Sequence, residues 1–120
     1  MENRELSQED LDAIKNDVID YKIVEKLADI MKALSEPSRI QIIHALSISE
    51  MCVTDLSYAL NMTQPLVSHH LRILRNLGLV KYERDGKALI YSLDDEHVLM
   101  LYKQGLEHAK EKVQIGRAHV

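Results

Sequence analysis

Apolar residues recur at helical spacing through the first third of the chain. One set lies at positions 11, 14 and 18, and a second set continues it at positions 23, 27, 30, 31 and 34. Intervals of three and four residues place such side chains on one face of a helix. Ser7 and Asp10 form a suitable capping pair at the start of this pattern. We therefore predict helix over residues 7–34.

The segment SEP, residues 35–37, interrupts the pattern and begins a further helix. Pro37 suits a first helical turn, because the backbone N–H that proline lacks has no helical partner there. Ile40, Ile43 and Leu46 follow at helical spacing. We expect these three side chains to face inward.

The segment TDLSYALNMTQPLVSHHLRILRNLGL, residues 54–79, has the pattern of two short helices joined by a tight turn. Thr54 is a good N-cap for a helix ending near Leu60, and Thr63 is a good N-cap for the second helix, whose first turn tolerates Pro65. Apolar residues at 67, 71 and 74 face the core, and Gly78 ends the second helix. This arrangement is typical of a helix-turn-helix.

Two alternating runs rich in β-formers follow, and they flank Asp85-Gly86, a strong hairpin signal. A hairpin directly after a helix-turn-helix predicts a winged helix. Ser92-x-x-Asp95 then opens a last helix that we expect to run to about Val113. The predicted fold is mainly α with a small β-hairpin wing. It forms a single winged-helix domain over residues 1–115, followed by an unstructured tail at 116–120.

Composition agrees with a small cytoplasmic protein. The chain has 120 residues, of which 46% are hydrophobic and 28% charged, an ordinary balance for one globular domain. No apolar run approaches the ~20 residues that a membrane-spanning helix needs, and the acidic N-terminus MENRELSQED is unlike a signal peptide. The lone Cys52 excludes an internal disulfide and a metal cage of several cysteines.

One stretch of this chain is basic, although the net charge of the whole is −4. Residues 63–92 hold five basic and two acidic side chains, and local positive charge is what phosphate binding uses. The alternative is a solvated basic face without a partner.

The second helix of the predicted motif would place its N-terminal half in the major groove of DNA. Ser68, His69 and Arg72 lie opposite the apolar face of this helix, and Gln64 lies at its start. Gln can pair with adenine and Arg with guanine through two hydrogen bonds each. These four residues are therefore candidates for base contacts.

Further candidates surround this helix. Thr63 and the neighbouring amides can bind a phosphate at the helix N-terminus. Arg84 and Lys87 flank the hairpin tip, within reach of backbone phosphates or the minor groove. An ordinary solvated polar residue is the alternative for each. We interpret His70 as a partly buried core histidine and His44 as a satisfied histidine on a packed helix.

The last predicted helix carries Asp95, His97, His108 and Glu111. Because a helix turns about 100° per residue, His97 and His108 lie on one face, about 20° apart. They stand ~16 Å apart along the axis, whereas Zn–N bonds measure ~2 Å. One helix therefore cannot bring both histidines to one ion.

Two antiparallel copies of the helix, related by a twofold axis, can do so. His97 of one copy then lies beside His108 of the other, and Asp95 lies beside Glu111, because both pairs share a midpoint near residues 102–103. The dimer would hold two identical sites, each built from both chains. Gly105 lies near the crossing, where close backbone approach would offset the ~1 kcal/mol that Gly costs a helix interior.

Two imidazoles and two carboxylates suit tetrahedral Zn²⁺, and Co²⁺ can substitute. Four protein ligands leave no open position for a substrate water. This argues against a metallohydrolase with a small-molecule substrate and favours a structural or sensing site. The alternatives are that Asp95 only caps the helix, that Glu111 pairs with a nearby Lys, and that the histidines are polar interface residues.

Together these motifs resemble the ArsR/SmtB family of bacterial metal-sensing repressors. The resemblance runs from about residue 25 to residue 113. LADIMKALSEPSRIQIIHAL is similar to the leading helices of the family, and residues 54–93 are similar to its winged helix. The spacing D-x-H-x10-H-x2-E in the last helix is similar to the site of the zinc-sensing branch.

The resemblance implies a homodimer that associates through its first and last helices, binds operator DNA when metal-free and is released by zinc. It also implies that His108 hydrogen-bonds through its outer nitrogen to a backbone carbonyl near Gly78. The branch that senses nickel or cobalt is an alternative, but it adds N-terminal histidines that this sequence lacks. A winged-helix DNA-binding or dimerisation module without metal sensing is the other alternative.

Two positions depart from the family pattern. Branches that sense cadmium, lead or arsenic have a Cys-x-Cys pair near the first helix of the motif, whereas EMCVTDL has Cys52 with Thr54 in the second place. We therefore interpret Cys52 as a small buried residue rather than a ligand. Pro65 stands where the family often has a small polar residue, which puts one base or phosphate contact in question.

Overall fold

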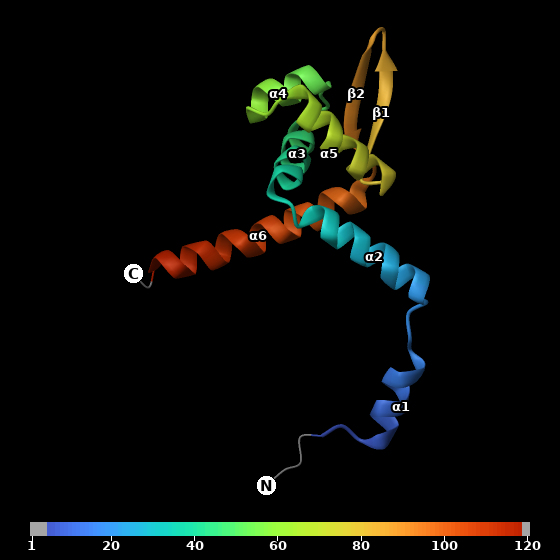
Figure 1. Cartoon of the computed structure of the whole chain (residues 1–120). Coiled ribbons are helices and arrows are strands. Elements are labelled where there is room, and N and C mark those ends of the chain that lie inside the picture. Colours follow the sequence, from blue (N-terminus) through green and yellow to red (C-terminus); the bar gives the residue numbers. More distant parts are fainter. Residues whose placement is uncertain (1–4, 119–120) are drawn as a thin grey trace.

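The computed structural model describes residues 5–118, with side chains through residue 114. Six helices and one two-stranded antiparallel sheet make up this part of the chain (Figure 1). They are α1 (Gln8–Asn16), α2 (Tyr21–Leu34), α3 (Pro37–Ile48), α4 (Val53–Leu60), α5 (Gln64–Asn76), β1 (Val80–Asp85), β2 (Ala88–Leu93) and α6 (Glu96–Ala118). The predicted fold class is confirmed. Within residues 5–118, no helix is long and apolar enough to cross a membrane.

The core lies where α3, α4, α5 and the base of the hairpin meet. Seven large side chains there are almost fully shielded from solvent: Ile42, Ile43, Leu56, Val67, Leu71, Leu74 and Val80. The predicted inward face of α5 is thereby confirmed, as are the predicted inward positions of Ile43 and Leu46. Ile40 was also expected to face inward, but it remains 44% exposed. The reason is that it lines an open groove beside α6.

The predicted helix-turn-helix consists of α4 and α5. Asn61 turns the chain between them in the left-handed conformation, with a φ of 53°, which Asn adopts more readily than most residues. Thr63 caps α5, since its Oγ1 accepts a hydrogen bond from the N–H of Leu66 at 3.3 Å. The predicted N-cap of α4, Thr54, is wrong. Cys52 holds that position, because its carbonyl accepts the first helical hydrogen bond.

The hairpin wing is confirmed, but its turn lies one residue further on than predicted. Asp85 pairs with Ala88 as the last rung of the ladder, so the two-residue turn consists of Gly86 and Lys87. Gly86 has a φ of +63°. A positive φ at the first central residue is what a type II′ turn requires, and this turn suits the twist of a hairpin.

The single helix predicted over residues 7–34 is wrong, because α1 and α2 share this stretch. Asp20 caps α2, and its carboxylate accepts a hydrogen bond from the N–H of Lys22 at 2.8 Å. Short polar residues in the sequence NDVID, residues 16–20, favour caps over helix interiors. The predicted cap at Ser7 is confirmed by a hydrogen bond of 3.1 Å from the N–H of Asp10 to its Oγ.

The start and end of α6 also differ from the prediction. Asp95 caps this helix, since its carboxylate accepts a hydrogen bond from the N–H of Val98 at 3.1 Å. Ser92, expected to open the helix, belongs to β2. The helix continues to Ala118, so residues 116–118 of the predicted unstructured tail are helical. Residues 119 and 120 lie outside the described part of the chain.

The N-terminal arm, formed by α1 and the first half of α2, points away from the core (Figure 1). The radius of gyration is 19.6 Å, whereas a compact domain of this length has a value of roughly 14 Å. α1 buries no side chain, and the apolar residues Ile14 and Ile23 are 61% and 60% exposed. An exposed apolar surface of this kind is typical of an interaction site.

Gly78 follows α5 with a φ of +72°, and a Cβ added there would meet nothing within 4 Å. Gly78→Ala should therefore lower the free energy of unfolding by about 1 kcal/mol through backbone strain alone. Urea unfolding at a fixed protein concentration measures this change. Gly78→Asn, which tolerates left-handed backbone, is the control and should cost less. Equal stability of the Ala variant and the wild type would contradict the helix-ending role.

Candidate DNA-binding and metal-binding sites

The N-terminal half of α5 presents a polar face to solvent. Gln64 and His69 are exposed and Ser68 is half-buried, and Arg72, further along the helix, is exposed as well. The apolar side chains of Val67, Leu71 and Leu74 on the same helix are buried in the core. Thr63 caps the N-terminal end of α5, where unpaired backbone N–H groups of a helix attract anions. The structure thus places these five predicted DNA-contacting residues along one helix, from its N-cap Thr63 to Arg72 beyond its midpoint.

The two predicted contacts on the wing are exposed as well. Arg84 lies near the end of β1, and Lys87 lies in the turn. The wing projects from the core as a separate extension (Figure 1). Arg84 and Lys87 thus present their side chains to solvent on a different element from the α5 residues. Their contact with DNA stays a prediction.

Arg75 joins α5 to the wing, a contact that the sequence analysis did not anticipate. Its guanidinium carbon lies 4.4 Å from the centroid of the Tyr82 ring. The Tyr82 ring in turn lies 5.4 Å from that of Tyr91, its partner across the hairpin. Main-chain hydrogen bonds of 2.8 and 3.1 Å connect Tyr91 to Met51. The only available signal was a Tyr in each run of the predicted hairpin.

His70 is buried in α5, as predicted, and is 6% exposed. The Nε of Arg39 donates a hydrogen bond to its Nδ1 at 3.2 Å, and Oε2 of Glu36 lies 3.8 Å from its Nε2. Burial is the largest influence and lowers the pKa of His70, although the Glu36 carboxylate opposes this. His44 contacts the Tyr102 hydroxyl through Nδ1, which satisfies its ring as predicted, but it remains exposed.

Asp95 and His97 form a close pair at the start of α6. Oδ2 of Asp95 lies 3.5 Å from Nδ1 of His97, whose side chain is 91% exposed. The hydrogen bond from the backbone N–H of Val98 is the main cause that lowers the pKa of Asp95, and His97 contributes. An ionised carboxylate therefore stands beside an imidazole at the surface, and both groups are zinc ligands.

His108 and Glu111 are exposed further along the same helix. The interval of eleven residues separates His108 from His97 by ~16 Å along a straight helix, and α6 is one unbroken rod (Figure 1). Within residues 5–118, no three His, Cys, Asp or Glu side chains come together as a metal-binding group. One chain thus holds the four predicted ligands at two separate places on α6. The assembled four-ligand site and the hydrogen bond from His108 to a carbonyl near Gly78 stay predictions.

Cys52 is half-buried rather than buried. It lines an open depression of about 370 Å³ together with Thr54 and Lys87. No second thiol exists in the sequence to complete a thiolate site. The interpretation of Cys52 as a non-ligand stays a prediction.

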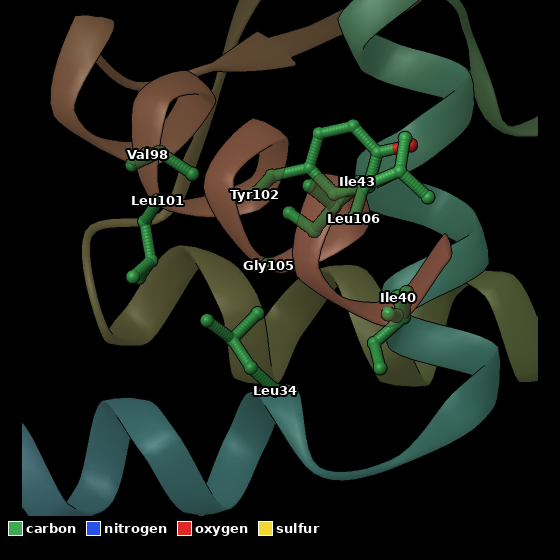
Figure 2. Close-up of a pocket in the computed structure, with 9 residues that line it drawn as sticks. Leu34, Ile40, Ile43, Val98, Leu101, Tyr102, Gly105 and Leu106 are labelled. Atoms are coloured by element: carbon green, nitrogen blue, oxygen red, sulfur yellow. The ribbon is translucent and has the colours of Figure 1, made fainter. Parts of the chain in front are cut away.

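An apolar groove of about 300 Å³ separates α6 from the α2–α3 junction (Figure 2). Its walls include Leu34, Ile40, Ile43, Val98, Tyr102 and Leu106. Gly105 lies in the same wall, and a Cβ added there would meet nothing within 4 Å. Another backbone can therefore approach α6 at Gly105, which lies between the two pairs of predicted ligands and nearer to His108.

Comparisons with known proteins identify the family. Residues 36–82 match the family described as bacterial regulatory protein, arsR family. The chain is 43% identical over 91 residues to the cadmium resistance transcriptional regulatory protein CadC homolog of Staphylococcus aureus, covering 75% of each protein. The chain belongs to the arsR family. It is also 40% identical over 98 residues to the transcriptional repressor SmtB homolog of Synechocystis sp., covering 82% of this chain and 74% of that one.

The structure of this arsR-family protein resembles a solved relative. The homodimeric winged helix-turn-helix DNA-binding domain of Mb0332 from Mycobacterium bovis superposes with a TM-score of 0.73 and 28% identity, covering 76% of this chain and 84% of that one. The predicted winged helix-turn-helix is thereby confirmed. As a member of the arsR family, the protein is a DNA-binding transcriptional regulator and not an enzyme.

Arg72→Ala should weaken binding to a sequence-specific duplex by about tenfold or more, because a bidentate arginine–guanine pair contributes ~1–3 kcal/mol. The measurement is fluorescence anisotropy with a duplex that the wild type has selected from a random-sequence pool. Zinc uptake should not change. Lys15→Ala removes the same charge from α1 and serves as the control. Unchanged affinity of the Arg72 variant would contradict a base contact by this residue.

Proposed function

We propose that this arsR-family protein is a homodimeric, zinc-responsive repressor of the bacterial cytoplasm. It binds operator DNA when metal-free and is released by zinc. The observation that carries the proposal is the pair of exposed half-sites on α6, Asp95 with His97 and His108 with Glu111, on either side of an open apolar groove.

Dimerisation would cover the apolar surface that the single chain exposes. Leu27 and Met31 of α2, and Met100, Leu101 and Val113 of α6, are all at least 40% exposed. Burial of apolar surface contributes ~25 cal/mol per Å², so a second copy of this surface is a favourable cover. An antiparallel pair of α6 helices that cross near residues 102–103 would use the open space at Gly105.

The donor set of the assembled site fits zinc. In the antiparallel pairing, Asp95 and His97 of one protomer meet His108 and Glu111 of its partner. Two imidazoles and two carboxylates are tetrahedral ligands for Zn²⁺, and Co²⁺ accepts the same set. Asp95 and His97 already lie close enough to share an ion, with 3.5 Å between Oδ2 and Nδ1. Bound zinc would supply a cross-link between the two α6 helices.

The elements that would contact DNA are α5 and the wing. Gln64, Ser68, His69 and Arg72 would contact base edges, because they share the exposed face of α5. Thr63 and the amides at the start of α5 would hold a phosphate. Arg84 and Lys87 would contact the backbone or the minor groove from the wing. A twofold dimer would present two copies of α5 and the wing to the two halves of the operator. These halves lie about 34 Å apart, one helical turn of DNA.

The link between metal and DNA would run through His108. Its outer nitrogen would donate a hydrogen bond to a backbone carbonyl near Gly78, at the end of α5. Any arrangement of α6 that forms this bond then also sets the position of α5. A coupling free energy of ~1–3 kcal/mol would weaken operator binding about 5- to 150-fold.

His97→Gln and His108→Gln should each leave metal-free operator binding intact but make it insensitive to zinc, since each removes one of the two imidazoles from both sites. A zinc titration of the protein–operator complex, followed by anisotropy, measures this. His44→Gln is the matched control, because His44 packs beside α6 and is not a predicted ligand. Normal release of either ligand variant by zinc would reject the site.

A further inference from the structure

A polar cluster of Glu36, Arg39 and His70 connects α2, α3 and α5. Glu36 caps α3, with its Oε2 accepting a hydrogen bond from the N–H of Arg39 at 3.0 Å. The Arg39 guanidinium reaches in two directions. Its Nη1 donates to the carbonyl of Ala33 in the last turn of α2 at 3.3 Å, and its Nε donates to His70 of α5 at 3.2 Å. Arg39 therefore connects α2 to the recognition helix.

The chemistry of this contact fixes the form of His70. The Nε–H of an arginine is always a donor, so Nδ1 of His70 must be the acceptor. The neutral ring then carries its proton on Nε2, which faces Oε2 of Glu36 at 3.8 Å. A protonated ring would set an N–H against the guanidinium instead. The charged and titratable groups that act on His70 are Glu36 and Arg39 of α3 and the neighbouring His69 of α5.

The core contacts of α5 define its rotation less sharply, and the contact of Arg75 with the Tyr82 ring lies near the C-terminal end of the helix, beside the wing. Val67, Leu71 and Leu74 pack in the core, and apolar burial has no directional preference. A hydrogen bond weakens steeply as its angle departs from linear. His70 lies directly after His69 and two residues before Arg72, and both of these neighbours are predicted to contact bases. The hydrogen bond to its ring therefore restrains the orientation of α5 next to the side chains that are predicted to contact bases.

We infer that the contact of His70 with Arg39 and Glu36 sets the orientation of the recognition helix relative to α2, and through the dimer relative to the partner's recognition helix. His70 and Arg39 are positioning residues for operator binding. This inference rests on the proposed function. The two recognition helices must keep a fixed spacing only if the protein binds a two-part operator as a dimer.

The test compares specific with non-specific DNA binding. The probes are a duplex selected by the wild type from a random-sequence pool and an unselected random duplex of equal length. His70→Leu removes the acceptor, whereas His70→Gln keeps a side-chain oxygen that can accept from Arg39. Arg39→Met removes the donors and keeps the aliphatic stem. Circular dichroism checks that each variant is folded.

The ratio of specific to non-specific affinity should fall about tenfold in His70→Leu and in Arg39→Met, a loss typical of coupled contacts. Non-specific affinity should stay the same, because the phosphate-contacting side chains are untouched. His70→Gln should restore most of the ratio. The double variant should lose no more than Arg39→Met alone, because Arg39→Met already removes the contact with His70.

Two results would overturn the inference. One is an unchanged ratio in a folded Arg39→Met or His70→Leu variant. The other is an equal fall in specific and non-specific binding without rescue by Gln, which indicates general destabilisation. A wild type that selects no sequence from the pool would overturn the proposed function itself, and the positioning role with it. The wild-type selection therefore separates failure of the proposed function from failure of the inference.

Discussion

A rigid helix fixes the separation of the side chains that it carries, and this constraint governs the chemistry of α6. His97 and His108 share a face but stand ~16 Å apart along the axis, far beyond the ~2 Å of a Zn–N bond. No rotamer change within one chain can close that gap. In the proposed site, each histidine with its neighbouring carboxylate would therefore supply half of the ligands, and a second copy of the helix is the simplest source of the other half.

The apolar surface of the molecule points to the same second copy. The helix-turn-helix and the base of the wing share one well-shielded core, whereas α1, the first half of α2 and the outer face of α6 expose large apolar side chains. The groove beside Gly105 lies between these two regions. α6 thus carries part of the exposed apolar surface together with the proposed metal ligands.

The spacing and types of residues in short segments predicted those parts of the fold that depend on neighbours in the sequence. The spacing of Val67, Leu71 and Leu74 gave the buried face of α5, and the pattern around Gly86 gave the hairpin. The break between α1 and α2 was missed although two features indicate it. The interval from Val18 to Ile23 is five residues rather than three or four, and Asp20 between them is a favourable N-cap residue. The partner of His70 could not be foreseen, since Arg39 lies 31 residues away and nothing local links them.

The central claim, that each metal site draws its ligands from two chains, is tested most directly by mixing two inactive variants. His97→Gln and His108→Gln homodimers each lack a complete site. A heterodimer of the two contains one site that has lost both histidines and one site that has kept both. Co-refolding the variants and measuring zinc by equilibrium dialysis should therefore restore zinc uptake that neither variant shows alone. Uptake by the mixture that is no greater than that of the separate variants would contradict a site shared between chains.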